Sequence, residues 1–257
     1  MSSPSIWASG RYESVAEHIA SIADEVVAAA DRRVPLRGGA LVDLACGTGS
    51  AAFAAAAKGA TVTAVDLTPE LVAIGAAKDV GGRITWLTAD ASDTGLPRAE
   101  YDAVVSNMGI IFVAPDPQVA ELARLLKPGG VLCFSSWIKA DDNPFFDPIV
   151  TVLGAPPTGG HSPDQWADPT VVEQRLSPAF TDLEVTERTF TWEFASPAAA
   201  LHFLVHESPM HVNVFRHVDE GQRNRLTAAF RDAIEPHTEA TGVHFDTPYA
   251  VVSATRR

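Results

Sequence analysis

Short apolar runs alternate with helix-type patterns along the first half of the chain. The apolar runs, each bounded by turn residues, predict buried strands at 41–46, 61–66, 84–89, 101–106 and 131–136. The intervening segments carry helix signals at 50–58, from Thr68-Pro69-Glu70 onward, and at 117–126. Strands that alternate with helices indicate a mainly parallel sheet that is covered on both faces.

The flanking segments carry looser patterns. Apolar residues recur at helical spacing over 14–32, behind a capping-box pair of Ser14 and Glu17, so we expect an amphipathic helix there. The aromatic segment Trp7–Tyr12 before it is interpreted either as a packing anchor for that helix or as a flap over a ligand site. Beyond Trp137 the pattern predicts a long loop, a helix, a strand, two helices and a last strand, at 139–167, 169–176, 180–194, 196–207, 219–237 and 243–254.

Together these elements predict an α/β fold of the Rossmann-like, doubly wound type. The sheet is expected to have seven strands, to be mainly parallel, and to carry a helical insertion before its last strand. Ligands of open α/β sheets bind at the carboxyl ends of the strands, so this insertion is our candidate substrate lid. We expect one domain, made of an N-terminal helical flap, an α/β core, the lid and the last strand at 1–33, 34–194, 195–240 and 241–257.

Composition narrows the class of partner. The formal net charge of −13 and the lack of a Lys/Arg run argue against a nucleic-acid partner, whose phosphates would require cationic side chains. The two cysteines are too few for a disulfide framework in a chain of 257 residues. We see no signal-peptide pattern and no apolar stretch long enough to span a membrane. We therefore expect a cytoplasmic protein with a small-molecule substrate and an undetermined oligomeric state.

The residues that follow the predicted strands suggest a nucleotide-like ligand. Ala45-Cys46-Gly47-Thr48-Gly49 forms a small-residue turn after the first strand, where the backbone can approach a ligand closely. Asp66 closes the second strand and could accept hydrogen bonds from ribose hydroxyls. Asp90 follows the third strand and could accept from the amine of adenine, while Asn107 follows the fourth and would face the polar tail of the ligand. A single acidic residue at a strand end is often only a turn cap. Polar residues at the ends of three successive strands make that interpretation weaker.

At this point the chain resembles the class I S-adenosylmethionine-dependent methyltransferases, in the group similar to the quinone-biosynthesis enzymes. The resemblance rests on the stretches VDLACGTG from Val42, VDLTPEL from Val65, LTADA from Leu87, YDAVVSN from Tyr101 and LLKPGG from Leu125. It covers about residues 41–137. Many members carry glycine where this chain has Ala45, which departs from the pattern only slightly.

The resemblance implies that S-adenosylmethionine is the cofactor and S-adenosylhomocysteine the product. Asp43 would orient the glycine turn and the methionine amine, and Asp66 would hold the ribose. Asp90 and Ala91 would bind adenine, and Asn107 would line the methionine side. The full set of implied cofactor-binding residues is Tyr12, Asp43, Ala45, Cys46, Gly47, Gly49, Asp66, Leu67, Asp90, Ala91, Asn107 and Met108.

The expected reaction is direct transfer of a methyl group to an oxygen, nitrogen or activated carbon of a small, apolar or aromatic metabolite. Such a displacement depends mostly on positioning, so a catalytic side chain is not always required. If a base acts, a lid histidine is the expected type, and the weak candidates are His202, His206 and His211. His202 and His206 lie one helical turn apart but lack a third ligand, so we predict no metal site. The aromatic and aliphatic lid residues fit core packing better than substrate contact; they are Phe203, Leu204, Phe215 and Phe230.

Two alternatives remain open at this stage. Gly47-Thr48-Gly49-Ser50-Ala51-Ala52 also fits the G-x-G-x-x-A pattern of an NAD(P)-dependent oxidoreductase, with Asp66 near the expected spacing. Asp43 and the Lys127–Gly130 turn are not part of that pattern. The other alternative is a protein that binds S-adenosylmethionine without catalysing a reaction.

Overall fold

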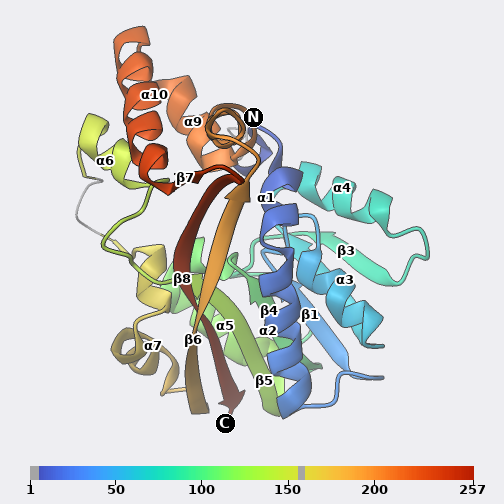
Figure 1. The fold of residues 1–257 in the computed structure, drawn as a ribbon. Helices are drawn as coiled ribbons and strands as arrows, with labels where there is room; N and C mark the ends of the chain where they lie inside the picture. The colour runs from blue at the N-terminus through green and yellow to red at the C-terminus, as the bar shows by residue number, and fades with distance from the viewer. Residues whose placement is uncertain (1–5, 156–159) are drawn as a thin grey trace. The chain divides into compact units, whose positions relative to one another are not determined.

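The fold is described from a computed structural model that covers residues 6–155 and 160–257 (Figure 1). Its sheet has the strand order β3-β2-β1-β4-β5-β8-β6, and a short eighth strand, β7, pairs with β8. The strands are β1 (Ala40–Leu44), β2 (Thr61–Asp66), β3 (Ile84–Thr88), β4 (Tyr101–Asn107), β5 (Leu126–Trp137), β6 (Phe180–Phe194), β7 (Thr238–Glu239) and β8 (Gly242–Arg256).

The neighbouring pairs from β3 to β5 are parallel, whereas β5 and β8 are antiparallel. The predicted α/β, Rossmann-like, mainly parallel sheet is therefore confirmed. The sheet has eight strands in the described chain rather than the predicted seven, because the two residues of β7 fold back on Gly242 and Val243. So short and exposed a strand leaves no alternating apolar pattern in the sequence.

The chain divides into two compact units. The unit that we call the sheet unit comprises Ile19–Ile138, His161–Arg188 and Tyr249–Arg257. The other, which we call the helical unit, comprises Met1–His18, Lys139–Gly160 and Thr189–Pro248. The strands β6 and β8 contribute residues to both units. The predicted lid falls within the helical unit, and its function as a lid stays a prediction.

In the sheet unit, helices pack on the parallel strands because those strands are apolar on both faces. α2 contacts β4, β5 and α3, whereas α5 contacts β4, β5 and α7; α4 contacts β2 and β3. These helices are α2 (Ala20–Arg33), α3 (Ser50–Ala57), α4 (Pro69–Lys78), α5 (Pro115–Leu125) and α7 (Pro169–Leu176), with short turns η2 (Ile110–Phe112) and η3 (Pro163–Trp166).

The helical unit is built around aromatic side chains. Phe145 has ring neighbours in Trp192, Phe194, Phe203 and Phe245, all of them buried. Phe203, Leu204, Phe215 and Phe230 are buried too, as expected for core packing. The elements of this unit are η1 (Ile6–Ala8), α1 (Tyr12–His18), α6 (Asp147–Leu153), α8 (Pro197–His202), the π-helical turn η4 (Phe203–Glu207), α9 (Pro209–His217), α10 (Glu220–Ile234) and η5 (Glu235–His237).

Three local predictions need correction. The helix expected over 14–32 is interrupted at Ile19, whose carbonyl accepts a hydrogen bond from the Asn107 side chain (3.3 Å). The expected turn Lys127–Gly130 lies inside β5, where the register against β4 shifts. The helix α9 was not expected, although Ser208-Pro209 is a usual start of a helix. In the described ranges no helix is long and apolar enough to cross a membrane.

Candidate functional site

The sheet order places a topological switch point beside β1. From β1 the chain proceeds to β2 and β3 on one side, and then to β4 and β5 on the other side. The connections after β1 and β4 therefore leave in opposite directions, and open α/β sheets bind ligands at the carboxyl ends of such a strand pair. The small-residue turn after β1, Asn107 at the end of β4 and Met108 directly after it lie at this switch point.

The turn after β1 is tightly wound. Ala45, Gly47 and Gly49 all have positive φ, at 51°, 57° and 93°. At Gly49 a Cβ atom would lie 2.4 Å from the ring of Trp86, so only glycine fits. Ala45 holds a left-handed conformation that costs a non-glycine residue about 1–2 kcal/mol. The alanine that departs from the family pattern thus keeps the backbone shape that glycine would allow.

Asp66 ties this turn to the end of β2. Its Oδ2 accepts a hydrogen bond from the Gly47 N–H and its Oδ1 one from the Thr68 N–H, both at 2.8 Å. Burial raises the pKa of Asp66 above its ordinary value, although these donors oppose that shift. A carboxylate has about four acceptor positions. Capacity to accept from ribose hydroxyls therefore remains, and the predicted contact of Asp66 with a ribose stays a prediction.

Asp43 is a buried acid whose side-chain oxygens lack partners. It is 1% exposed, and neither oxygen has a hydrogen-bond partner of good geometry among the described residues. Burial raises its pKa to about 8, the Ala52 N–H opposes the shift, and the nearby Asp66 adds to it. The Thr48 hydroxyl in the same turn is likewise buried and unpartnered in the described chain. Buried polar groups without partners are rare and call for an explanation.

The end of β2 and the loop after β3 present groups to solvent. Leu67, directly after Asp66, exposes 63% of its surface although it is aliphatic. Asp90 is exposed, and its Oδ1 accepts from the N–H and the hydroxyl of Ser92 (2.8 and 2.7 Å). Ala91 is buried, and its carbonyl accepts from Gln118. Both residues predicted to bind adenine thus lie on one short loop.

Asn107 and Met108 are held by hydroxyl groups. Ser135 Oγ on β5 donates to Asn107 Oδ1 (2.8 Å) and accepts from the Met108 N–H (2.9 Å). Met108 is buried and has a φ of 55°, which is rare for a side chain of this size. The Asn107 amide is committed to Ser135 and Ile19, so this side chain shapes the wall of the site; its predicted cofactor contact stays a prediction.

Cys46 and Tyr12 have less direct roles in this geometry. Burial and the nearby acids raise the pKa of the Cys46 thiol well above its ordinary value, so it remains a neutral thiol. Tyr12 belongs to the helical unit, where its ring meets that of Trp7 edge-on at 6.5 Å. The predicted contact of Tyr12 with the cofactor stays a prediction.

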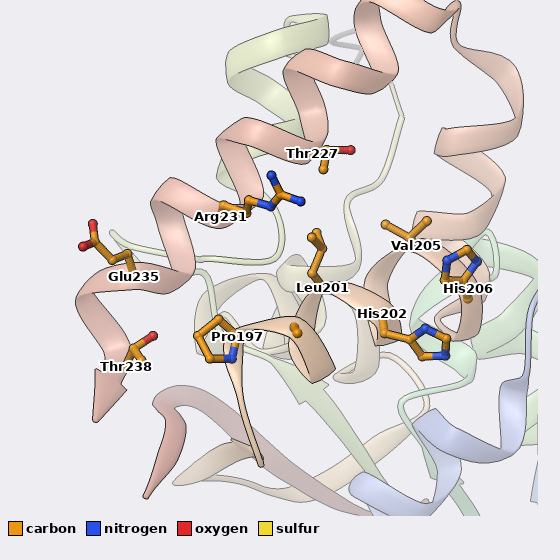
Figure 2. A pocket seen from close by; sticks show the side chains of 10 residues that line it. Pro197, Leu201, His202, Val205, His206, Thr227, Arg231, Glu235 and Thr238 are labelled. Carbon is orange, nitrogen blue, oxygen red and sulfur yellow. The ribbon is translucent and has the colours of Figure 1, made fainter. Parts of the chain in front are cut away.

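Two of the three candidate bases line a groove in the helical unit. Figure 2 shows His202 and His206 on α8 and η4, with Leu201 and Val205 beside them and Arg231 across on α10. The groove holds about 640 Å³, and the two imidazole rings are 4.8 Å apart. In the described ranges no group of three or more metal-ligating side chains occurs.

His211 is not free to act as a base. Its Nε2 is 2.8 Å from the Phe145 carbonyl, which can only accept, so Nε2 carries the hydrogen. Nδ1 then accepts from the Ser208 hydroxyl at 2.7 Å. Burial lowers the pKa of His211 to about 4, which keeps the ring neutral near pH 7. Both nitrogens are occupied by the fold.

The residues that hold the site loops were not among the predicted site residues. Ser106 Oγ donates to the Leu44 carbonyl at 2.7 Å, and Ser135 binds the residues after β4. Gln118 and Glu121 of α5 bind the loop after β3. Serines within apolar strands were the available signal, since a buried hydroxyl must find a partner.

Comparison with known proteins identifies the family. Residues 42–134 match the family model described as "Methyltransferase domain". An aklanonic acid methyltransferase of Streptomyces is 31% identical over 54% of this chain and 67% of its own length. The chain belongs to the class I S-adenosylmethionine-dependent methyltransferases.

Other members of the methyltransferase family match more locally. A demethylmenaquinone methyltransferase of Clavibacter sepedonicus is 38% identical over 38% of this chain and 42% of its own length, which fits the quinone-biosynthesis group. An uncharacterised protein of Mycobacterium tuberculosis is 38% identical over 51% of this chain and 48% of its own length. The chain thus spans about half the length of the first curated relatives that it matches.

Solved structures agree with this methyltransferase fold. One of them is a phosphoethanolamine N-methyltransferase of Haemonchus contortus, solved with phosphomonomethylethanolamine and S-adenosylhomocysteine. The structural match covers 91% of this chain and 52% of that protein's chain. The TM-score is 0.56 at 19% sequence identity, a likeness of fold.

The residues at the switch point fit the cofactor that gives the family its name. Asp43 and Thr48 are buried polar groups without partners in the described chain, and a ligand with amine and carboxylate groups would satisfy such atoms. Exposed Leu67 would gain from covering an aromatic base. The methyltransferase assignment and the geometry of the site therefore point to the same ligand.

Proposed function

We propose that this chain binds S-adenosylmethionine at the carboxyl ends of β1 to β4 and transfers its methyl group to a small molecule. The observation that carries the proposal is the buried carboxyl group of Asp43 beside Asp66, which has no hydrogen-bond partner of good geometry in the described chain. No cation pairs with either acid among the ion pairs of the described residues, and a ligand that carries an ammonium and a sulfonium would supply positive charge.

In this proposal the residues of the chain bind and orient. Asp66 would accept from the ribose hydroxyls, Asp43 would attract the amine of the methionine part, and Asp90 would accept from the amine of adenine. The bound cofactor supplies an electrophilic methyl carbon on a positively charged sulfur. The acceptor atom forms a bond to that carbon, the carbon–sulfur bond breaks, and the acceptor's proton leaves to solvent or to a base. We assign no base among the three candidate histidines; His211 is excluded because both of its ring nitrogens are bonded within the fold.

We infer that the acceptor is a small molecule, and its reacting atom is oxygen, nitrogen or activated carbon. The net charge of −13 supports a small molecule over a nucleic acid. The name of the Streptomyces relative assigns an organic acid as its substrate. The NAD(P)-dependent alternative loses its support, since the matched family is that of the methyltransferases. We propose the cytoplasm as the site of action.

The test is a binding comparison with S-adenosylhomocysteine, NAD and NADP by thermal shift and calorimetry. We expect stabilisation by S-adenosylhomocysteine alone, because a ligand that binds only the folded state raises its stability. The change Asp66→Asn should weaken this binding by ~1.5–3 kcal/mol, the range for hydrogen bonds to a charged acceptor. The matched control is Asp79→Asn, because Asp79 also accepts two backbone N–H groups, but after α4 and before β3.

Two results would contradict the proposal. Stabilisation by NAD or NADP and not by S-adenosylhomocysteine would favour the alternative function, an NAD(P)-dependent oxidoreductase. Equal affinity in Asp66→Asn and wild type would show that the ribose lies elsewhere. If binding is as expected, release of S-adenosylhomocysteine from S-adenosylmethionine in an acceptor screen separates a methyltransferase from a protein that only binds the cofactor.

A further inference from the structure

Polar side chains on one face of α5 form hydrogen bonds with the loop that follows β3. Gln118, Glu121 and Arg124 recur at intervals of three residues, so they share a face of the helix. All three donate to or accept from the loop 90–96, which lies 27 or more residues earlier in the chain. Within the loop itself, Asp90 and Asp93 form an isolated bridge, and the Leu96 N–H donates to the Thr94 hydroxyl at 3.2 Å.

Gln118 holds the buried residue of the loop. Its Nε2 donates to the Ala91 carbonyl at 3.2 Å, and the side chain is 0% exposed. Because a carbonyl can only accept, the amide cannot be turned around, and Oε1 is left as the buried atom without a partner among the described residues. A fully buried amide in an otherwise amphipathic helix is costly unless its hydrogen bonds matter.

Glu121 and Arg124 hold the middle and the end of the loop. Glu121 Oε1 accepts from the Thr94 N–H (3.0 Å) and from the Thr94 hydroxyl. Arg124 binds both oxygens of Glu121, at 2.6 and 2.7 Å, and donates to the Leu96 carbonyl at 2.7 Å. Burial would raise the pKa of Glu121, but the bonds from Arg124 and Thr94 outweigh it and hold that pKa below its ordinary value.

Removing these polar side chains from water costs free energy, and apolar side chains could cover the loop without that cost. An apolar helix face would cover the loop without the partly buried ion pair of Glu121 and Arg124, whose side chains are 5% and 25% exposed. Polar contacts instead fix the loop in one register, since each donor must meet its own acceptor. Of the two residues that the resemblance assigns to adenine, Ala91 is held directly by Gln118, and Asp90 is the residue immediately before it.

We propose that Gln118, Glu121 and Arg124 are positioning residues that set the selectivity of the site for the adenine base. This inference rests on the proposed function, because it takes the loop after β3 as the site of the base. The three side chains act through Ala91, Thr94 and Leu96 and hold Asp90 where it can accept from the exocyclic amine.

The experiment compares the affinities of two ligands that differ only in the substituent at position 6 of the purine. S-adenosylhomocysteine carries the amine there, whereas its 6-deamino analogue carries a hydrogen atom and has no N–H at that position to donate to Asp90. We expect wild type to prefer the adenosyl ligand about tenfold, the effect of one hydrogen bond. Gln118→Met keeps the volume and loses the donor, and it should reduce this preference to about threefold or less.

Two further variants complete the design. Glu121→Gln keeps the shape and an acceptor but loses the ion pair with Arg124, so it tests the same role if Gln118→Met does not fold. Asp102→Asn is the matched control: Asp102 binds Lys127 (2.7 Å) and the Ala40 N–H (2.8 Å) near the start of β4, away from the loop. It should lower stability and leave the ligand preference unchanged.

The outcomes separate this inference from the proposed function. If wild type binds neither ligand, the proposed function fails and the inference with it. If wild type binds both ligands equally well, Asp90 does not accept a hydrogen bond from the amine of the base. In that case the inference alone fails. If a variant loses stability but keeps the wild-type preference, α5 only supports the fold, and the inference is again overturned.

Discussion

At the scale of single residues, Asp43 has the most unusual environment. The fold buries an acid without a cation and without a hydrogen-bond partner of good geometry in the described chain. Desolvation then keeps the proton on the carboxyl up to a pH of about 8. A cationic ligand reverses this preference, since it stabilises the ionised form. Ligand binding and the loss of a proton are therefore coupled at this residue.

We predict that the affinity for S-adenosylhomocysteine rises with pH between about 6 and 8. Asp43 is protonated in the ligand-free protein below about pH 8, so binding there must release its proton. The affinity should rise by up to about tenfold per pH unit if only the ionised form binds. Calorimetry in buffers of different ionisation enthalpy counts the released protons directly. Asp43→Asn should bind more weakly, with a flatter pH dependence; an unchanged proton count in that variant would refute the coupling.

Individual residues also show how far the sequence could lead. Asp66, Asp90 and Asn107 were placed at the ends of their strands because apolar runs have clear ends. The partners of those side chains were not predictable. Asn107 binds Ile19 and Ser135, which are 88 and 28 residues away, and neither residue carries a local signal for such contacts.

At the scale of elements, the carboxyl ends of β1 and β4 and the residues that follow them pack closely against each other. Ser106 near the end of β4 donates to the Leu44 carbonyl at the end of β1. Just beyond, Gly109 lies against Ala45, so closely that a Cβ atom on Gly109 would come within 2.4 Å of the Ala45 carbonyl. Backbone cannot move aside as a flexible side chain can, so the shape of the turn after β1 depends on this glycine.

We predict that Gly109→Ala destabilises the protein by about 1–3 kcal/mol, the usual range for overpacking. It should also weaken S-adenosylhomocysteine binding, because the displaced Ala45 belongs to the turn that faces the ligand. Urea unfolding and calorimetry measure the two effects. The matched control is Gly39→Ala, whose added Cβ would have no neighbour closer than 3.4 Å. Equal urea midpoints for Gly109→Ala and Gly39→Ala would contradict a close contact between Gly109 and the Ala45 carbonyl.

The order of elements was predictable, whereas several boundaries were not. The alternation of strands and helices follows from hydrophobic period and turn residues alone. The break at Ile19 depends on a hydrogen bond from β4, and the start of β5 at Leu126 depends on pairing with Tyr101. Such decisions rest on tertiary contacts that override local preference, so a single sequence does not show them.

At the scale of the whole molecule, the two units are stabilised by different interactions. The sheet unit buries aliphatic side chains between strands and helices, whereas the helical unit has an aromatic core around Phe145. That core contains the hydrogen-bonded chain from Ser208 through His211 to the Phe145 carbonyl. As a whole residue His211 is only partly buried, but its two nitrogens face buried partners, so desolvation applies to the atoms that titrate.

We predict that the protein loses stability as the pH falls from about 6.5 toward 4. The folded state holds His211 neutral down to a pKa of about 4, whereas the unfolded chain takes up the proton near 6.5. The unfolded state therefore binds more protons in this window. The resulting loss is up to about 3 kcal/mol at 1.36 kcal/mol per pKa unit.

Urea unfolding across this pH range measures the loss. In His211→Gln the slope should be shallower, on a lower starting stability. His217→Gln on the same helix is the control, because His217 is exposed and, among the described residues, its ring bonds only to the Asn213 carbonyl. If His211→Gln keeps the wild-type slope, other groups account for the acid sensitivity.

The hydrogen on His211 Nε2 has a consequence of another kind. It is donated to the buried Phe145 carbonyl inside the helical unit, so we expect it to exchange with solvent mainly when that hydrogen bond opens. Imidazole hydrogens at a protein surface exchange too fast to be seen, whereas this one should persist as a separate proton resonance. That resonance would report, at a single atom, how often the structure around His211 opens.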